Sequence, residues 1–129
     1  MDYTINRVFS GATFDEIVGR TREALTGQGF GVLTEIDVKQ TLKKKIDADI
    51  NDYLILGACS PKMAHEAIKI EPRIGAMLPC NVIIRSLDDG QVEVSAIDPQ
   101  ASMQAVENDK LQDVAGEVKS MMQTVVTNI

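Results

Sequence analysis

The sequence predicts a single α+β domain over residues 1–129, in which long helices cover one face of a mainly antiparallel sheet. Three observations carry this prediction. Short apolar runs alternate with stretches of helical periodicity, Asp88-Asp89-Gly90 separates two strand-like runs, and no linker, repeat or low-complexity tract divides the chain. A chain of 129 residues can also bury a core of its own.

The chain begins with a predicted strand and helix. Residues 3–9 alternate apolar and polar side chains, which is typical of a half-buried strand. Thr13 and Glu16 form a T-x-x-E capping box, and apolar residues then recur at helical spacing to about residue 28. The glycines within residues 27–31 follow a helix rather than a strand, so they indicate a helix end and a turn instead of a phosphate-binding loop.

A second strand and a short helix follow. Residues 30–36 have strand character, and Asp37 with Gln40 predicts the cap of a helix over residues 38–47. The basic run at residues 43–45 lies among acidic residues, which favours a solvated helix face over an anion-docking patch.

The middle of the chain predicts the centre of the sheet. Residues 53–59 are nearly all apolar, as expected for a strand buried on both faces. Ser60 and Pro61 are a favoured N-cap and first residue of the next helix, which Pro72 ends. Residues 80–97 then form a predicted hairpin of two strands.

Helices are predicted for the C-terminal part. Residues 101–106 suggest a short helical piece, and the stretch from Leu111 to Ile129 carries one apolar stripe opposite charged residues. The predicted order is therefore β-α-β-α-β-α-β-β-α.

Composition and charge exclude several classes of function. The chain has 13 basic and 19 acidic residues, for a net charge of −6, and no Trp. An acidic surface repels phosphate backbones, so we expect no nucleic-acid partner. No apolar run approaches the roughly 20 residues that span a bilayer, and the N-terminus lacks a signal-peptide pattern. We therefore expect a cytoplasmic protein that does not bind membranes, with its cysteines present as thiols.

Residues 57–81 contain most of the side chains that could do chemistry. They include both cysteines, the only histidine and three of the four prolines. Cys59 lies at a strand end just before a helix N-terminus, where the helix dipole favours a thiolate, and Lys62 could add positive charge. The alternative is that Cys59 is a small buried apolar residue, as free cysteines often are.

Cys80 opens the strand predicted to pair with residues 53–59, so the two cysteines could approach each other. Cys59, Cys80, His65 and Glu66 have the donor types of a soft-metal site. Their spacing is not that of a zinc site, however, and two cysteines alone cannot satisfy zinc. We therefore predict no metal ligand set, and a solvent-facing or capping His65 is favoured. No serine-hydrolase elbow, H-E-x-x-H motif or Walker loop is present.

The same segment resembles the prokaryotic family called domain of unknown function 302. The matching stretches are GACSP at residues 57–61, LPCNV at residues 78–82, IDP at residues 97–99, LTEIDV at residues 33–38, and Ala64, Glu71-Pro72 and Gly75. The resemblance implies a compact α+β fold with TATA-binding-protein-like topology, often dimeric. It implies no activity, since fold alone does not determine function.

These observations leave three functional hypotheses. The leading one is a non-catalytic module, a homodimer, that binds a small ligand or a sulfur or metal species, with no cofactor identified. The second is a thiol enzyme or sulfur carrier with Cys59 as nucleophile and Cys80 as resolving partner. The third is an interaction protein whose cysteines belong to the core. The predicted ligand-binding residues are Cys59, Ser60, Lys62, His65, Cys80 and Asn81.

Overall fold

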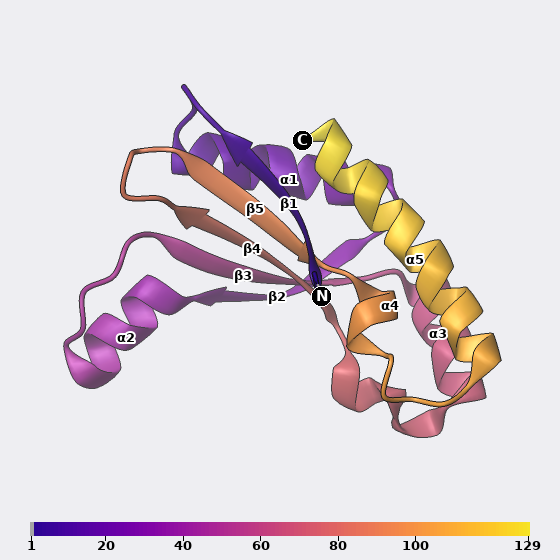
Figure 1. Ribbon diagram of the computed structural model, residues 1–129. Helices are drawn as coiled ribbons and strands as arrows, with labels where there is room; N and C mark the ends of the chain where they lie inside the picture. Colours follow the sequence, from indigo (N-terminus) through magenta and orange to yellow (C-terminus); the bar gives the residue numbers. More distant parts are fainter. Residues whose placement is uncertain (1) are drawn as a thin grey trace.

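The computed structural model describes residues 2–129, which form five strands and several helices around one sheet (Figure 1). The strands are β1 (Thr4–Phe9), β2 (Gly31–Asp37), β3 (Tyr53–Cys59), β4 (Cys80–Ser86) and β5 (Val92–Ile97). The helices are α1 (Phe14–Gly27), α2 (Val38–Ile46), α3 (Pro61–Ile70), α4 (Pro99–Ser102), α5 (Asp109–Asn128) and the 3₁₀ helix η1 (Pro72–Met77).

The strands form one antiparallel sheet in the order β1-β5-β4-β3-β2. β4 and β5 are the predicted hairpin, and β3 pairs with β4 near the middle of the sheet. The α+β class with an antiparallel sheet is therefore confirmed, whereas the TATA-binding-protein-like topology stays a prediction.

The main core lies between the sheet and helices α1 and α5, which cross the same face (Figure 1). Alternate strand residues point toward these helices, because successive side chains of a strand face opposite sides. Leu56, Val82, Ile84, Val94 and Ala96 are all completely buried there. Ile17 and Leu25 of α1 and Met122 and Val125 of α5 meet them with no exposed surface.

The opposite face of the sheet, here called the open sheet face, is not covered by α1 or α5 (Figure 1). By alternation and strand register it presents the following residues: Thr4, Asn6, Val8, Thr34, Ile36, Tyr53, Ile55, Asn81, Ile83, Arg85, Glu93, Ser95 and Ile97. Beside it, α2 projects from the end of β2, away from α1 and α5, and buries none of its residues.

Side-chain caps account for most helix starts. Glu16 donates its backbone N–H to Thr13 Oγ1 over 3.1 Å, and Gln40 donates to Asp37 Oδ1 over 3.0 Å, as the two predicted caps require. Ser60 is the N-cap residue of α3, but its hydroxyl makes no capping hydrogen bond. The predicted positions of Ser60 as N-cap and Pro61 in the first turn are nevertheless confirmed.

The C-terminal connection differs from the prediction. The short helix begins at Pro99 and ends at Ser102, earlier than residues 101–106. The reason is Asp98, whose carboxylate accepts hydrogen bonds from the backbone of Gln100 and Ala101 and so fixes the helix start. Among residues 2–129, no helix combines the length and apolar character needed to cross a bilayer.

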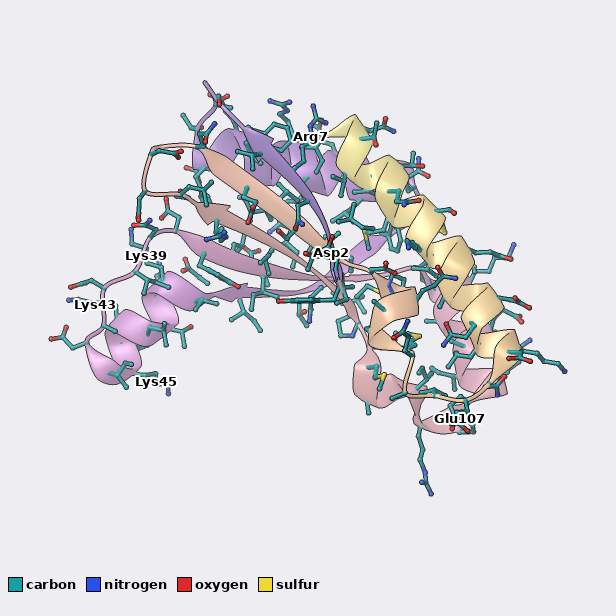
Figure 2. The ribbon with its side chains drawn as sticks, in the orientation of Figure 1. Asp2, Arg7, Lys39, Lys43, Lys45 and Glu107 are labelled. Atoms are coloured by element: carbon teal, nitrogen blue, oxygen red, sulfur yellow. The ribbon has the colours of Figure 1, made fainter. Side chains whose placement is uncertain are left out.

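Two arginines, one from the sheet and one from α1, hydrogen-bond the C-terminal end of α5. Arg7 of β1 donates to the backbone carbonyls of Val126 and Thr127, at 3.1 and 2.8 Å (Figure 2). Arg20 of α1 donates to the carbonyl of Ile129 at 2.9 Å. Cations at a helix C-terminus satisfy free carbonyls and favour the helix dipole, so α5 is held over the core at this end.

Candidate functional site

Both cysteines lie at the same end of the sheet, on neighbouring strands. Cys80 is the first residue of β4 and stands opposite Ala58 of β3 in the antiparallel register. Cys59, the last residue of β3, directly follows Ala58. The chain then turns into α3 through Ser60, and η1 returns it to β4 through Pro79. Residues 21 positions apart in the sequence are thus brought together by strand pairing.

A cavity of about 30 Å³ lies at this junction. Its walls come from β3, α3, the Leu78-Pro79-Cys80 segment, the α4 region and the first half of α5. Among the lining residues, Cys59, Ser60 and Cys80 carry thiol or hydroxyl groups. The other lining residues are Phe30, Ala58, Met63, Ala64, Ala67, Leu78, Pro79, Pro99, Met103, Leu111, Val114, Ala115 and Val118.

The size and lining of the cavity limit what it can hold. By the measure of roughly 10–15 Å³ for one water-sized molecule, about two such molecules fit. Pockets for drug-sized ligands and cofactors are about 300–1,000 Å³, so the cavity as it stands excludes them. An apolar wall that includes two cysteines suits a small soft species, because sulfur ligands prefer soft partners.

Cys80 is the more buried of the two thiols, with 8% of its surface exposed, whereas Cys59 is half-buried. Burial, and secondarily the charge of Cys59, raise the pKa of the Cys80 thiol from 9.0 to about 11. Cys80 is therefore a protonated thiol at neutral pH. Of the two thiols, Cys59 is therefore the better candidate for the first nucleophilic attack on a substrate.

The raised pKa of Cys80 predicts a loss of stability at alkaline pH. The unfolded thiol ionises near pH 9 and the folded thiol near pH 11, so stability is fully present below pH 9 and declines between these values. We expect the free energy of unfolding to fall by about 2 kcal/mol more in the wild type than in Cys80→Ala over this range. Urea unfolding at several pH values measures it, and parallel curves for both proteins would contradict it.

The other predicted site residues lie in different places. Ser60 is half-buried and lines the cavity. Lys62 and His65 are exposed on α3 and are not among the lining residues. Asn81 is exposed and lines a groove on the open sheet face, because it follows Cys80 and so points to the other side of the sheet.

Within residues 2–129, no three His, Cys, Asp or Glu side chains gather closely enough to hold a metal ion. The set of Cys59, Cys80, His65 and Glu66 is therefore not assembled. Glu66 instead pairs with Lys69 at 2.8 Å, one turn along α3, and this ion pair lowers the pKa of its carboxyl. Only the two cysteines of the set share a cavity.

Sequence reasoning missed the walls contributed from distant parts of the chain. Phe30 lies in the turn before β2, and Leu111 and Ala115 belong to α5. The apolar stripe of α5 predicted a buried face, but it carries no signal for which part of the sheet that face covers. The covering of the cysteines by α5 is a product of tertiary packing.

Comparisons with known proteins agree on one family. The family model described as "Domain of unknown function DUF302" matches residues 6–129. A solved structure, "Crystal structure of uncharacterized conserved protein DUF302 from Bacillus stearothermophilus", is similar with a TM-score of 0.92 and 21% identity, over 99% of this chain and 98% of that one. A search of curated proteins finds no match. At this identity the structural likeness establishes the fold alone.

Proposed function

The chain belongs to the DUF302 family, and we propose that it is a non-catalytic binding module that holds a small sulfur-bearing or thiophilic species in the cavity between Cys59 and Cys80. One observation carries this proposal: the two cysteines of the chain, 21 residues apart, line the same apolar cavity. Two thiols at one small cavity offer a paired soft donor set, which neither thiol offers alone.

The size of the cavity supports a species of a few atoms. A sulfane sulfur atom or a cuprous ion is of that size, whereas a nucleotide or a flavin is not. Ser60 adds a hydroxyl to the lining, and Lys62 and His65 lie outside it on the exposed side of α3. In this proposal Cys59, Ser60 and Cys80 hold the ligand, and Lys62 and His65 do not contact it. Asn81 belongs to the other face of the sheet.

Anaerobic titration of the reduced protein with two probes, cuprous ion released from a chelator and inorganic polysulfide, tests the binding proposal. We expect one equivalent of at least one probe to bind per chain, and Cys59→Ser and Cys80→Ser each to lower its affinity at least tenfold. His65→Ala serves as the matched control and should bind like the wild type, because His65 does not line the cavity. Failure of both probes to bind, or equal binding by the serine variants, would refute the proposal.

The alternative is a thiol enzyme or sulfur carrier, and the difference in burial between the cysteines favours Cys59 as its nucleophile. The Cys59 thiolate would attack a sulfane sulfur of a persulfide, form a Cys59 persulfide and release the thiol that had carried the sulfur. In the resolving step the Cys80 sulfur would lose its proton and attack the Cys59 sulfur of this persulfide, forming a Cys59–Cys80 disulfide and releasing hydrosulfide. The raised pKa of Cys80 slows this step at neutral pH.

Alkylation of the folded Cys80→Ser variant by iodoacetamide separates these functions. A reactive Cys59 should reach its maximal alkylation rate at a lower pH than a free cysteine thiol does. Labelling that occurs only on unfolding would exclude the thiol enzyme and the sulfur carrier. It would instead support the hypothesis that Cys59 is only a core residue. The binding titration remains informative in either case, because it does not require a thiolate in the free protein.

We also propose that the protein functions as a homodimer. The mass of one chain is 14.1 kDa, so light scattering should give roughly twice this value.

A further inference from the structure

The open sheet face contains a groove of about 520 Å³ that the proposed site does not use. The groove crosses β1, β5, β4 and β3, and its lining includes Tyr53, Ile83 and Ile97. Where the face reaches the sheet edges, Val8 of β1 is 46% exposed and Ile36 of β2 is 48% exposed. Large apolar side chains on the face that α1 and α5 leave uncovered mark it as an interaction surface.

The charges of this face are balanced, unlike those of the protein. Among the strand residues that the structure describes on this face, Arg85 of β4 and Glu93 of β5 are the charged ones, and they stand opposite each other in the strand register. Arg85 donates from Nε to Glu93 Oε1 over 2.9 Å, and its Nη2 forms an ion pair with the same oxygen at 2.9 Å. The face therefore carries no net charge on a chain whose net charge is −6. Two copies can meet through it without the repulsion that would oppose contact elsewhere.

The Arg85–Glu93 pair is also complementary to itself under two-fold symmetry. A two-fold axis near the pair places each arginine next to the partner's glutamate, because an isologous interface brings the same patch of both subunits together. Both side chains keep exposed surface, 42% for Arg85 and 20% for Glu93. Each can therefore take part in a four-membered charge network across the interface. Because Arg85 and Glu93 are already paired within the chain, neither offers an unpaired charge to a small charged ligand. This favours a second copy of the chain as the occupant of the face.

The area of the open sheet face is sufficient for such a contact. Five strands spaced about 4.8 Å apart, with six or seven residues rising about 3.3 Å each, cover roughly 20 Å by 20 Å. Two copies then bury roughly 800 Å² of flat area, and more once the relief of the side chains is counted. A specific interface needs about 1,000 Å². Helix α2 can supply the remainder, since Ile46 on it is 69% exposed.

We propose that the open sheet face is the two-fold interface of a homodimer, with Arg85 of each protomer beside the partner's Glu93. An axis parallel to the strands sets the β2 edge and α2 of one protomer over the β1 edge of the other, where Val8 is exposed. Ile46 of α2, which is 69% exposed, is then placed near the partner. This inference rests on the proposed homodimer but is independent of what the cysteines bind.

Sedimentation velocity of charge-reversed variants tests the interface. We expect the wild type to sediment as two chains, and Arg85→Glu and Glu93→Arg each to sediment as one chain at the same concentration. An equimolar mixture of the two variants should form a dimer again, because each variant supplies the charge that the other lacks across the interface. A role of the pair within one chain would not be restored by mixing, so this result separates the two roles.

Two further variants serve as controls, one for loss of folding and one for non-specific effects of charge reversal. The double reversal Arg85→Glu with Glu93→Arg restores the pair inside each chain and should be folded, by circular dichroism, and dimeric. Lys69→Glu reverses one member of the exposed Glu66–Lys69 ion pair on α3 and should leave the dimer unchanged. A wild type of one-chain mass would refute the homodimer itself. A dimeric wild type whose single reversals also remain dimeric, or whose mixed variants stay monomeric, would refute this surface alone.

Discussion

Replacing Gly57 with alanine is expected to lower the free energy of unfolding by about 2–3 kcal/mol. A Cβ atom at this position in β3 would clash with Thr34 Oγ1 and would lie 2.8 Å from Pro79 Cγ. Gly57 is buried, and the space above its Cα is filled by the Thr34 side chain and the Pro79 ring, so one or both must move to admit a methyl group. Because Pro79 leads directly into Cys80, the change should also disturb the cavity.

Chemical denaturation of Gly57→Ala beside Gly75→Ala measures this effect. Gly75 lies in η1, and a Cβ atom there would meet nothing within 4 Å. Alanine at this control position should leave stability unchanged or raise it by up to about 1 kcal/mol, because the unfolded chain loses freedom. Adding Thr34→Ala to Gly57→Ala should recover part of the loss. Equal stability of the two single variants would show that the close approach at Gly57 is not real.

Truncation of Leu56 to alanine is expected to cost more, about 2–5 kcal/mol. Leu56 lies in the middle of β3, has no exposed surface and belongs to the main core between the sheet and helices α1 and α5. The substitution removes buried apolar surface and leaves a void that tightly packed neighbours can only partly fill.

Thermal and urea unfolding of Leu56→Ala, with Leu33→Ala as the matched control, checks this prediction. Leu33 lies on the neighbouring strand β2 and is 66% exposed, so the same truncation should change stability by no more than about 0.5 kcal/mol. A loss at Leu33 as large as that at Leu56 would mean that the exposed leucine is covered, for instance by a second subunit. The pair of variants therefore also bears on the oligomeric state.

Much of the fold could be predicted from local patterns. The N-cap at Thr13, the cap at Asp37 and the hairpin turn at Gly90 act over a few residues, and the structure contains all three, although of the two bonds of the predicted T-x-x-E box only that from Glu16 N–H to Thr13 Oγ1 forms. Gly90 has a φ of +84°, a conformation that a residue without Cβ adopts readily. Where local signals competed, prediction was less accurate. The cap at Asp98 moved the start of α4 ahead of the predicted residues 101–106.

The candidate site was predicted only in part. Placing Cys59 at the end of one strand and Cys80 at the start of its antiparallel neighbour followed from the order of the elements, and the register of β3 and β4 agrees with it. The sequence favoured a solvent-facing or capping His65, and this side chain is exposed and is not among the residues that line the cavity.

The sequence by itself determined the order of the elements, the hairpin and the junction at which both cysteines lie, because periodicity, caps and turns depend on residues close together in the chain. Only the tertiary structure decided that α5 closes a small apolar cavity over the cysteines, that Cys80 is the buried thiol, and that one face of the sheet is left uncovered. These features arise from packing between distant segments. An amphipathic helix shows which of its sides will be buried, but what it packs against is settled only when the whole core is assembled.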